Sequence, residues 1–412
     1  MSISSIKTSF LDFYSSCNKP AFWFCLIELN QILGFTPGVP SVVLYAALIG
    51  YAVYVLFKQG VEFSMGLIAF LGYVPLALLV TSPDAIFNSW ERFVLFALLV
   101  ICVAPVVTNE DTIRNRRNMF KMVLVVCLII GVGSFFARFL GINFMRTYNK
   151  DFMTKVGLFG GLTTHSMMLG PIAGIGALYM AYIAYQTRKK WYWLLSALSI
   201  CSVMFSASRS ALAALVAGGT IMLFRLSGSV NKFVITAVIF VMVAAASFPL
   251  WGGAMDGVIA KNEANINAGG ATNSRENLWN SRLNEFQSSP VFGVGFAAID
   301  RQSSGDGGFD ERTGMVESGS SWLIILSMTG LLGALMLVPV LFKAYFTAYR
   351  DNDMFSALVC GILTLFFVHM IAEGYIFYGG SQMAFILWLT VGVAMDCKYE
   401  LLPDSDIEED NE

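Results

Sequence analysis

Charged residues are scarce in this sequence: only 13% of its 412 residues are Asp, Glu, Lys or Arg. A soluble domain carries about 25%. The formal net charge is −2, so no excess of basic residues favours nucleic acid as a partner. Apolar stretches of about 20 residues, the length that a helix needs to cross a bilayer, recur along the chain. These features argue against a soluble domain and predict an all-α, polytopic membrane protein.

Several chemical motifs are also absent. The seven cysteines lie near the N-terminus, within apolar stretches or at the end of the last one, so we expect neither a disulfide framework nor a metal site. There is no GxxxxGK[ST] phosphate loop and no HExxH pair, and nothing indicates ATP hydrolysis or redox chemistry. The first 19 residues are polar and mixed, without the cleavage pattern of a signal peptide. We therefore expect no cofactor and no metal.

The apolar stretches predict about 12 transmembrane helices. We place them near residues 20–36, 39–57, 64–81, 91–107, 119–142, 165–186, 191–207, 209–225, 232–253, 321–345, 354–376 and 379–396. No internal repeat is visible. We expect the whole chain, 1–412, to form a single integral membrane domain.

Lys and Arg in short loops set the orientation of membrane helices. The basic segments on one side of this topology are 114–121, 188–190, 225–232 and 343–350. That side is expected to be cytoplasmic, together with both termini and the acidic tail at 398–412. The other side is then periplasmic, and its one large loop is 254–320.

The cations on the two sides differ in kind. The inner side receives nine Lys and six Arg, and the outer side three Lys and eight Arg. The outer arginines are Arg92, Arg138, Arg146, Arg209, Arg275, Arg282, Arg301 and Arg312. A guanidinium group binds phosphate oxygens in a bidentate manner and loses less on desolvation than an ammonium group. The outer set therefore predicts an anionic, phosphate-bearing ligand, whereas any single member is as easily explained by solvated surface charge or contact with lipid headgroups.

The segment NSRENLWNSRLNEFQSSPVFGVGF, residues 273–296, is the most polar stretch of the large loop. It predicts an amphipathic helix whose apolar stripe is Leu278, Leu283 and Phe286 with Trp279, and which ends before Pro290. Arg275, Trp279, Arg282 and Phe286 are spaced to share one face. The helix either lies flat on the membrane with its aromatic residues as anchors, or closes over a lipid-linked substrate and presents Arg275 to it.

Two further candidates lie at the outer ends of predicted spans. Arg209, within SASRSALAAL, is close to hydrocarbon, where a cation is costly and often functional, although a long side chain near a helix end can also extend to the interface. His165 begins the sixth span and is one of only two histidines. A histidine there is more often a cap or a packing residue than a ligand of a substrate.

Two carboxylates are candidates for a catalytic base. Glu373 lies four residues after His369 in the span predicted over 354–376, so we expect the two to share a helix face. A glutamate within a span is costly unless it is paired or faces a cavity. Glu317 immediately precedes the span at 321–345, where it could equally be a capping carboxylate.

Taken together, these residues resemble the O-antigen ligase/polymerase superfamily over roughly residues 155–396. The resemblance is carried by SASRSALAAL (206–215), by R-x-x-L-W from Arg275 to Trp279 followed by PVFGVGF (290–296), and by S-S-W-x₇-G-L-L-G (320–333). It implies a GT-C type membrane glycosyltransferase that takes an undecaprenyl-pyrophosphate-linked glycan as donor. Inversion without a metal is implied, with the arginines matching 209 and 275 on the pyrophosphate. Arg282, Arg312, Trp279 and His165 are further candidates for contacts with the substrate.

One departure from the family pattern separates its branches. The ligases carry a histidine just before the tenth span, and the matching position here is Gly319. We therefore favour a Wzy-type polymerase, which joins lipid-linked repeat units, over a ligase that transfers glycan to lipid A-core. Glu317, Glu373 and Arg275 are the expected catalytic residues, and a chain-length-regulating co-polymerase is an expected partner. A transporter of lipid-linked sugars is a third alternative, but the chain lacks the repeated halves of such proteins.

Overall fold

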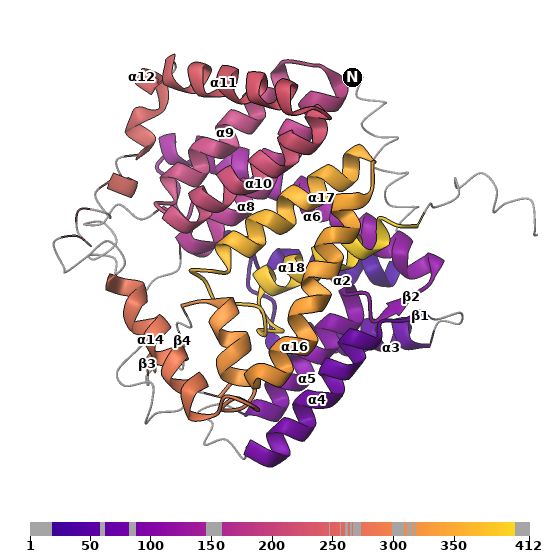
Figure 1. Cartoon of the computed structure of the whole chain (residues 1–412). Helices are drawn as coiled ribbons and strands as arrows, with labels where there is room; N and C mark the ends of the chain where they lie inside the picture. Colours follow the sequence, from indigo (N-terminus) through magenta and orange to yellow (C-terminus); the bar gives the residue numbers. More distant parts are fainter. Residues whose placement is uncertain are drawn as a thin grey trace, which may run out of the picture.

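The computed structural model describes residues 19–57, 62–81, 88–145, 159–246, 248–255, 257–259, 263, 266, 273–298, 309–310, 315–316 and 319–399. Over these residues the protein is helical apart from two pairs of two-residue strands. Figure 1 shows the helices side by side in a bundle, with the helix of the large loop lying against the end of a long, bent helix. The predicted all-helical fold is confirmed for this part of the chain.

A helix occupies each of the predicted spans. These helices are α2 (Lys19–Asn30), α3 (Ser41–Leu56), α4 (Met65–Thr81), α5 (Ser89–Val103), α6 (Glu110–Phe139), α8 (Ser166–Thr187), α9 (Trp191–Phe205), α10 (Arg209–Ser227), α11 (Val230–Ala246), α16 (Ser321–Arg350), α17 (Met354–His369) and α18 (Gln382–Asp396). Between α11 and α16 lie α12 (Phe248–Trp251), the 3₁₀ helix η1 (Gly252–Met255) and α14 (Asn273–Ser288). The strands β1 (Glu62–Phe63) and β2 (Val107–Thr108) pair antiparallel, as do β3 (Phe309–Asp310) and β4 (Met315–Val316).

Length and composition make four of the described helices able to cross a membrane, namely α6, α8, α10 and α16. Six shorter apolar helical segments accompany them: α3, α4, α9, Val230–Met242 of α11, α17 and α18. Large apolar side chains remain exposed on the outside of the bundle, including Val42, Leu79 and Phe139. This combination fits a membrane protein, because a hydrocarbon solvent carries no penalty for such a surface.

The largest difference from the predicted boundaries is in α6, which begins at Glu110 instead of near 119. Asn109 caps this helix: its side chain accepts from the Thr112 amide at 2.8 Å, and its own amide donates to the Thr112 hydroxyl at 2.9 Å. This reciprocal cap carries the helix through the basic segment 114–121. The helix therefore extends past the apolar stretch from which the span was predicted.

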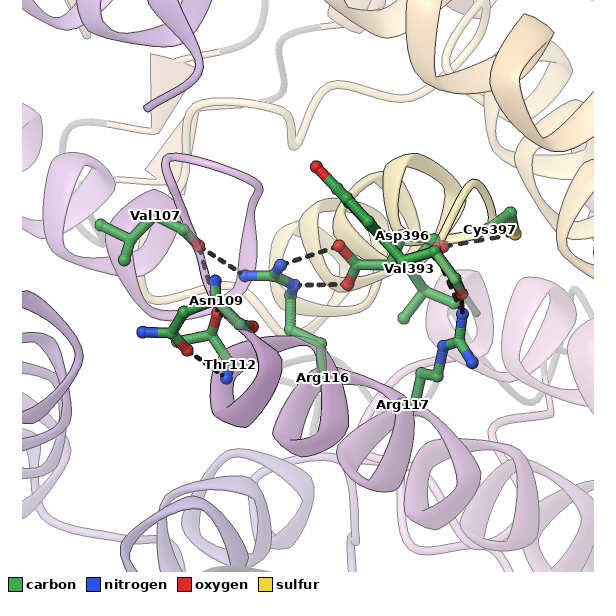
Figure 2. Close-up of polar contacts among 9 residues, drawn as sticks. Val107, Asn109, Thr112, Arg116, Arg117, Val393, Asp396 and Cys397 are labelled. Atoms are coloured by element: carbon green, nitrogen blue, oxygen red, sulfur yellow. Dashed lines mark hydrogen bonds and ion pairs between the residues drawn. The ribbon is translucent and has the colours of Figure 1, made fainter. Parts of the chain in front are cut away.

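Two arginines of this basic segment tie α6 to the end of α18 (Figure 2). Arg116 makes a bidentate contact with Asp396, with Nε–Oδ2 at 2.7 Å and Nη2–Oδ1 at 2.8 Å, and donates to the Val107 carbonyl at 2.9 Å. Both side chains of this ion pair are buried. Arg117 donates to the carbonyls of Asp396 and Tyr399. These two cations, which the topology predicted on the inner side, hold helix ends together.

A similar arrangement links the basic segments 225–232 and 343–350. Arg225, in the last turn of α10, donates to the Ala348 carbonyl at 2.6 Å and also contacts the Asp351 carbonyl. The two segments therefore lie at the same end of the bundle, as the topology predicts.

The span predicted as one helix over 321–345 is broken at Gly330, which has φ +64° and ψ −170°. The segment PVFGVGF crosses α16 at this break and satisfies the backbone groups that the break exposes. Leu331 donates its amide to the Pro290 carbonyl at 2.8 Å, and Val294 donates to the Ser327 carbonyl at 2.8 Å. The Tyr73 hydroxyl donates to the Thr329 carbonyl, also at 2.8 Å. Irregular backbone within a membrane protein is tolerated where protein groups pair it in this way.

Replacing Gly330 with alanine is expected to destabilise the protein by about 1–3 kcal/mol, because only glycine readily adopts this backbone conformation. An added Cβ would also collide with the Val291 carbonyl. The matched control is Gly72→Ala in α4, where an added Cβ has no neighbour within 4 Å. That change is expected to stabilise by about 0.5–1 kcal/mol. Unfolding of the two detergent-solubilised variants measures the difference, and equal stabilities would contradict the role of the break.

Candidate functional site

The predicted amphipathic helix exists as α14, and its first turn is held by an ion pair to a distant part of the chain. Nη2 of Arg275 lies 2.5 Å from Oε1 of Glu373, and both side chains are partly buried, at 16% and 15% exposed. One turn later, the Trp279 indole donates to the Gly319 carbonyl at 3.2 Å. Arg275, Trp279 and Glu373, three of the predicted site residues, are therefore brought together at one end of the bundle.

The inward face of α14 differs in part from the prediction. Leu278, Ser281, Arg282 and Glu285 are buried, whereas Leu283 of the predicted apolar stripe is 39% exposed and does not face the bundle. Arg282 is only 2% exposed, and its Nη1 lies 2.8 Å from Oε2 of Glu285, which is fully buried. Burial with a carboxylate on the same helix makes Arg282 part of the packing of α14, because a buried charge must be paired.

Two serines of the S-S-W motif hold the backbone around Glu373, a role that the sequence did not indicate. The Ser321 hydroxyl donates to the Glu373 carbonyl at 2.8 Å and accepts from the Tyr375 amide at 3.0 Å. Ser320 caps α16 and donates to the Met370 carbonyl at 3.1 Å. The following tryptophan, Trp322, donates to the Phe367 carbonyl at 3.0 Å. The motif thus fastens the start of α16 to the end of α17.

Glu373 does not lie within α17, as the span predicted to residue 376 required. The helix ends at His369, and the carbonyls of Met370 and Glu373 accept from Ser321 instead of continuing the helical pattern. In the turn that follows, the Tyr375 hydroxyl lies 3.2 Å from Nδ1 of His369. Burial and, next, the Glu373 carboxylate raise the pKa of Tyr375 well above its ordinary value. The phenol is therefore neutral beside the carboxylate.

Arg209 is the first residue of α10, directly after the cap. The Ser208 side chain accepts from the Ala211 amide, and the Ser206 side chain accepts from the Ser208 amide, both at 3.3 Å. Ser206 and Ser208, two of the three serines near this arginine, therefore accept from backbone amides at and just before the start of α10. The free energy of such capping bonds is about 1 kcal/mol each.

The packing of α10 on α17 indicates where Arg209 lies relative to Glu373. The helices lie side by side (Figure 1), and Arg225 at the end of α10 contacts Ser356 near the start of α17. Further along, Gly218 packs closely on Gly361 and Leu365. This register is antiparallel. The start of α10 therefore lies beside the end of α17. Arg209 and the turn that contains Glu373 are accordingly at the same end of the bundle.

His165 is the N-cap of α8, where its Nδ1 accepts from the Met167 amide at 3.1 Å. Further along α8, Gly170 packs on Ala211 and on Ser206 and Ser208. The histidine is therefore near the start of α10, and the structure shows it as a helix cap.

Arg138, a third arginine that the topology predicted on the outer side, lies in the last turn of α6. Its guanidinium carbon is 5.6 Å from the centroid of the Phe159 ring and 5.9 Å from that of Phe205, close enough for cation–π attraction. Phe205 is the last residue of α9, just before the serines that precede Arg209. The arrangement adds positive charge near the same end of the bundle.

The remaining predicted site residues, Arg312 and Glu317, lie outside the described residues. Among the residues that are described, no group of three or more His, Cys, Asp or Glu side chains is placed to hold a metal ion. The cysteines in this part of the chain are free thiols.

The comparison with known protein families adds a finding to this geometry. Residues 194–338 match the O-antigen ligase family. The matched stretch contains Arg209, Arg275 and the serine pair at 320–321, and the match is consistent with the O-antigen ligase/polymerase superfamily. It supports a function of that type, in which the family members are glycosyltransferase-like enzymes of polysaccharide synthesis. The comparison with curated proteins found no match.

Proposed function

We propose that this protein is a polymerase that joins oligosaccharide repeat units carried on undecaprenyl pyrophosphate. The observation that carries the proposal is the part-exposed guanidinium of Arg275, which lies at the same end of the bundle as Arg209. Two guanidinium groups near the end of membrane-spanning helices suit a lipid-linked diphosphate, because the polar head of such a substrate lies at the surface of the bilayer. The match to the O-antigen ligase family supports the same substrate class.

In the proposed reaction, Arg209 and Arg275 bind the diphosphate of the donor. A hydroxyl of the acceptor sugar attacks the anomeric carbon of the donor from the opposite side, and the bond to the diphosphate breaks. The leaving group takes the electron pair. Guanidinium groups fixed around it stabilise the charge that develops in the transition state. Glu373 or Glu317 receives the proton of the acceptor hydroxyl.

Gly319 supports a polymerase over a ligase. It occupies the position at which the resemblance places the ligase histidine, and its φ is +73°. An added Cβ there would press on the Cβ of Leu278, and the Gly319 carbonyl accepts from Trp279. A histidine at this position would strain the backbone and displace α14. In this chain the position therefore suits the docking of α14.

The ligase is the second candidate, because the matching family carries that description. For either enzyme we propose a GT-C type protein of the bacterial inner membrane, with both termini and the acidic tail at 398–412 in the cytoplasm. The large loop, with α14, would then face the periplasm. A co-polymerase that regulates chain length is the proposed partner.

Purified full-length protein, given undecaprenyl-pyrophosphate-linked repeat units in detergent, is expected to form products of two or more repeat units and to release undecaprenyl pyrophosphate. Gel electrophoresis and mass spectrometry measure both. In cells, deletion of the gene is expected to leave single repeat units on the acceptor lipid. Deletion of a ligase would instead leave long chains on the undecaprenyl carrier. If the purified protein makes no new glycosidic bond, either with lipid-linked repeat units alone or with lipid A-core added as acceptor, both enzymatic functions are excluded.

A further inference from the structure

The first half of α16 folds back against the second half. A straight helix would place residues 322 and 342 about 30 Å apart along its axis. In the structure the ring centroids of Trp322 and Phe342 are 6.3 Å apart, because the backbone changes direction at Gly330. Trp322 directly follows Ser321, which holds the backbone of the turn with Glu373. The start of the folded-back half is therefore part of the candidate site.

Trp322 is the first of six aromatic side chains in continuous contact over α16 and α17, which we call the aromatic ladder. Its members are Trp322, Phe367, Phe342, Tyr345, Phe346 and Tyr349. Between ring centroids, Phe367 lies 5.5 Å from Trp322 and 5.8 Å from Phe342. Along the second half of α16, Phe342 then contacts Phe346 at 6.4 Å. Tyr345 contacts Phe346 at 5.6 Å and Tyr349 at 6.1 Å. These separations all favour ring–ring attraction.

The ladder presents fixed rings on the surface of the bundle. Phe342, Phe346 and Tyr349 are 43%, 49% and 38% exposed. At one end of the ladder, the Trp322 indole is held by its hydrogen bond to the backbone of α17. At the other end, the guanidinium carbon of Arg225 lies 5.3 Å from the centroid of the Tyr349 ring, a cation–π contact. A ligand that packs on fixed rings loses little free energy in ordering them.

The course of the ladder indicates what binds to it. Exposure alone selects no occupant in a membrane, because lipid tails are as apolar as the side chains that they cover. A lipid whose diphosphate lies at Arg275, however, must extend from the candidate site along the bundle into the bilayer. The ladder begins beside that site at Trp322. It leads along α16 toward the opposite end of the bundle, where Arg225 contacts the Ala348 carbonyl.

A second pair of exposed rings, Phe136 and Phe139, does not follow such a course. They are 53% and 71% exposed and lie in the last turns of α6. Phe135 contacts both of them, and Phe205 at the end of α9 contacts Phe139. Aromatic side chains gathered at helix ends are typical of the membrane interface. This pair is therefore a comparison for the ladder.

From this geometry, and resting on the proposed function, we infer that the aromatic ladder binds the isoprene units next to the diphosphate of the lipid-linked donor. Isoprene units are flat and carry methyl branches, so they pack on ring faces over many atoms. Such contacts are individually weak and collectively strong. The diphosphate and the first isoprene units thus bind to adjoining parts of one site, and the ladder adds affinity for a polyprenyl lipid to the affinity of Arg275 for its head.

The test compares the diphosphate with and without its lipid. Purified full-length protein in detergent is titrated with undecaprenyl pyrophosphate and, separately, with inorganic pyrophosphate. The double variant Phe342→Leu with Phe346→Leu keeps an apolar surface but removes two rings of the ladder. It is expected to bind undecaprenyl pyrophosphate about 3- to 10-fold more weakly, through the loss of on the order of ten atom contacts. Its affinity for inorganic pyrophosphate is expected to stay within about 2-fold of the wild type, because the rings and the guanidinium group are separate sites.

The control is Phe136→Leu with Phe139→Leu, which removes two exposed rings from the end of α6. It is expected to change the affinity for either ligand by less than about 2-fold. Detergent takes up the lipid equally in every sample, so this uptake does not affect the comparison. If the ladder variant binds undecaprenyl pyrophosphate as tightly as the wild type, or if the control weakens binding as much, the ladder is not the lipid site.

A second measurement uses the wild type alone. Undecaprenyl pyrophosphate that carries a diazirine on its second isoprene unit is bound to the purified protein and irradiated, and the labelled peptides are identified by mass spectrometry. The label is expected within residues 321–350 and 354–369, and an excess of unlabelled undecaprenyl pyrophosphate should remove it. Label found instead on α6 or α11 would overturn the assignment of the ladder.

Failure of the ladder and failure of the proposed function give different results. If Arg275→Ala weakens the binding of inorganic pyrophosphate while the ladder variant binds the lipid as the wild type does, the ladder is wrong and the diphosphate site stands. If Arg275→Ala binds both ligands as tightly as the wild type, the diphosphate site is overturned, and the ladder with it.

Discussion

Arg275→Ala is expected to abolish long glycan chains in cells and to lower the rate of repeat-unit transfer by about 10²- to 10³-fold, the usual effect of removing one group that stabilises a developing anion. Arg275→Lys should also be impaired, because an ammonium group cannot make the bidentate contact of a guanidinium group. Chain length is measured by electrophoresis of the extracted glycan, and the rate with purified protein and lipid-linked repeat units.

Arg350→Ala is the matched control for this change. Arg350 is exposed at the end of α16, near the segment that Arg225 contacts, and it is expected to have no role in the reaction. Its variant should make chains of normal length. Membrane insertion of all three variants is checked by their abundance in the membrane fraction. A normal length distribution in Arg275→Ala would remove the main support for the proposed function.

The ion pair at the other end of the bundle predicts a large effect on stability. Arg116→Ala leaves Asp396 buried without its bidentate partner, and breaking such a pair costs about 3–5 kcal/mol. We expect the variant to unfold at a much lower temperature or to be lost from the membrane. Thermal unfolding in detergent measures the first outcome, and abundance in the membrane measures the second.

Arg114→Ala provides a control on the same helix. Arg114 lies 3.3 Å from Glu110, and the two side chains are 26% and 56% exposed. Such a pair on a helix surface contributes only about 0.3–0.5 kcal/mol. A double variant, Arg116→Met with Asp396→Leu, should recover much of the loss, because it removes both charges at once. Equal destabilisation by Arg114→Ala and Arg116→Ala would show that burial of the pair is unimportant.

Much of the helical framework was predictable because each helix is specified by neighbouring residues. The apolar stretches located a helix at every predicted span, although boundaries differed at α6 and α17. The spacing of polar and apolar residues located α14, whose end at Ser288 agrees with the prediction of an end before Pro290. The arginines of the candidate site were singled out by residue type, since their chemistry is visible in the sequence, and their role in binding a substrate stays a prediction.

The partners of these residues were not predictable. The pair of Arg275 with Glu373 joins residues 98 apart, and the pair of Arg116 with Asp396 joins residues 280 apart. The contacts of Ser321 with the turn after α17 join residues 52 and 54 apart. Local patterns carry no information on such contacts, because they arise only when helices from different parts of the chain pack together.

The sequence by itself determined that the chain forms apolar helices, and it predicted that arginine dominates the cations of the outer side. Only the tertiary structure decided which arginine side chain of α14 is partly exposed and which is buried. Arg275 and Arg282 lie on one face of the same helix, and by spacing alone they are equivalent. Packing of α14 on α16 buries Arg282 with Glu285 and leaves Arg275 part-exposed against Glu373. Hydropathy and helical period act over neighbouring residues, whereas exposure depends on everything that packs around a side chain.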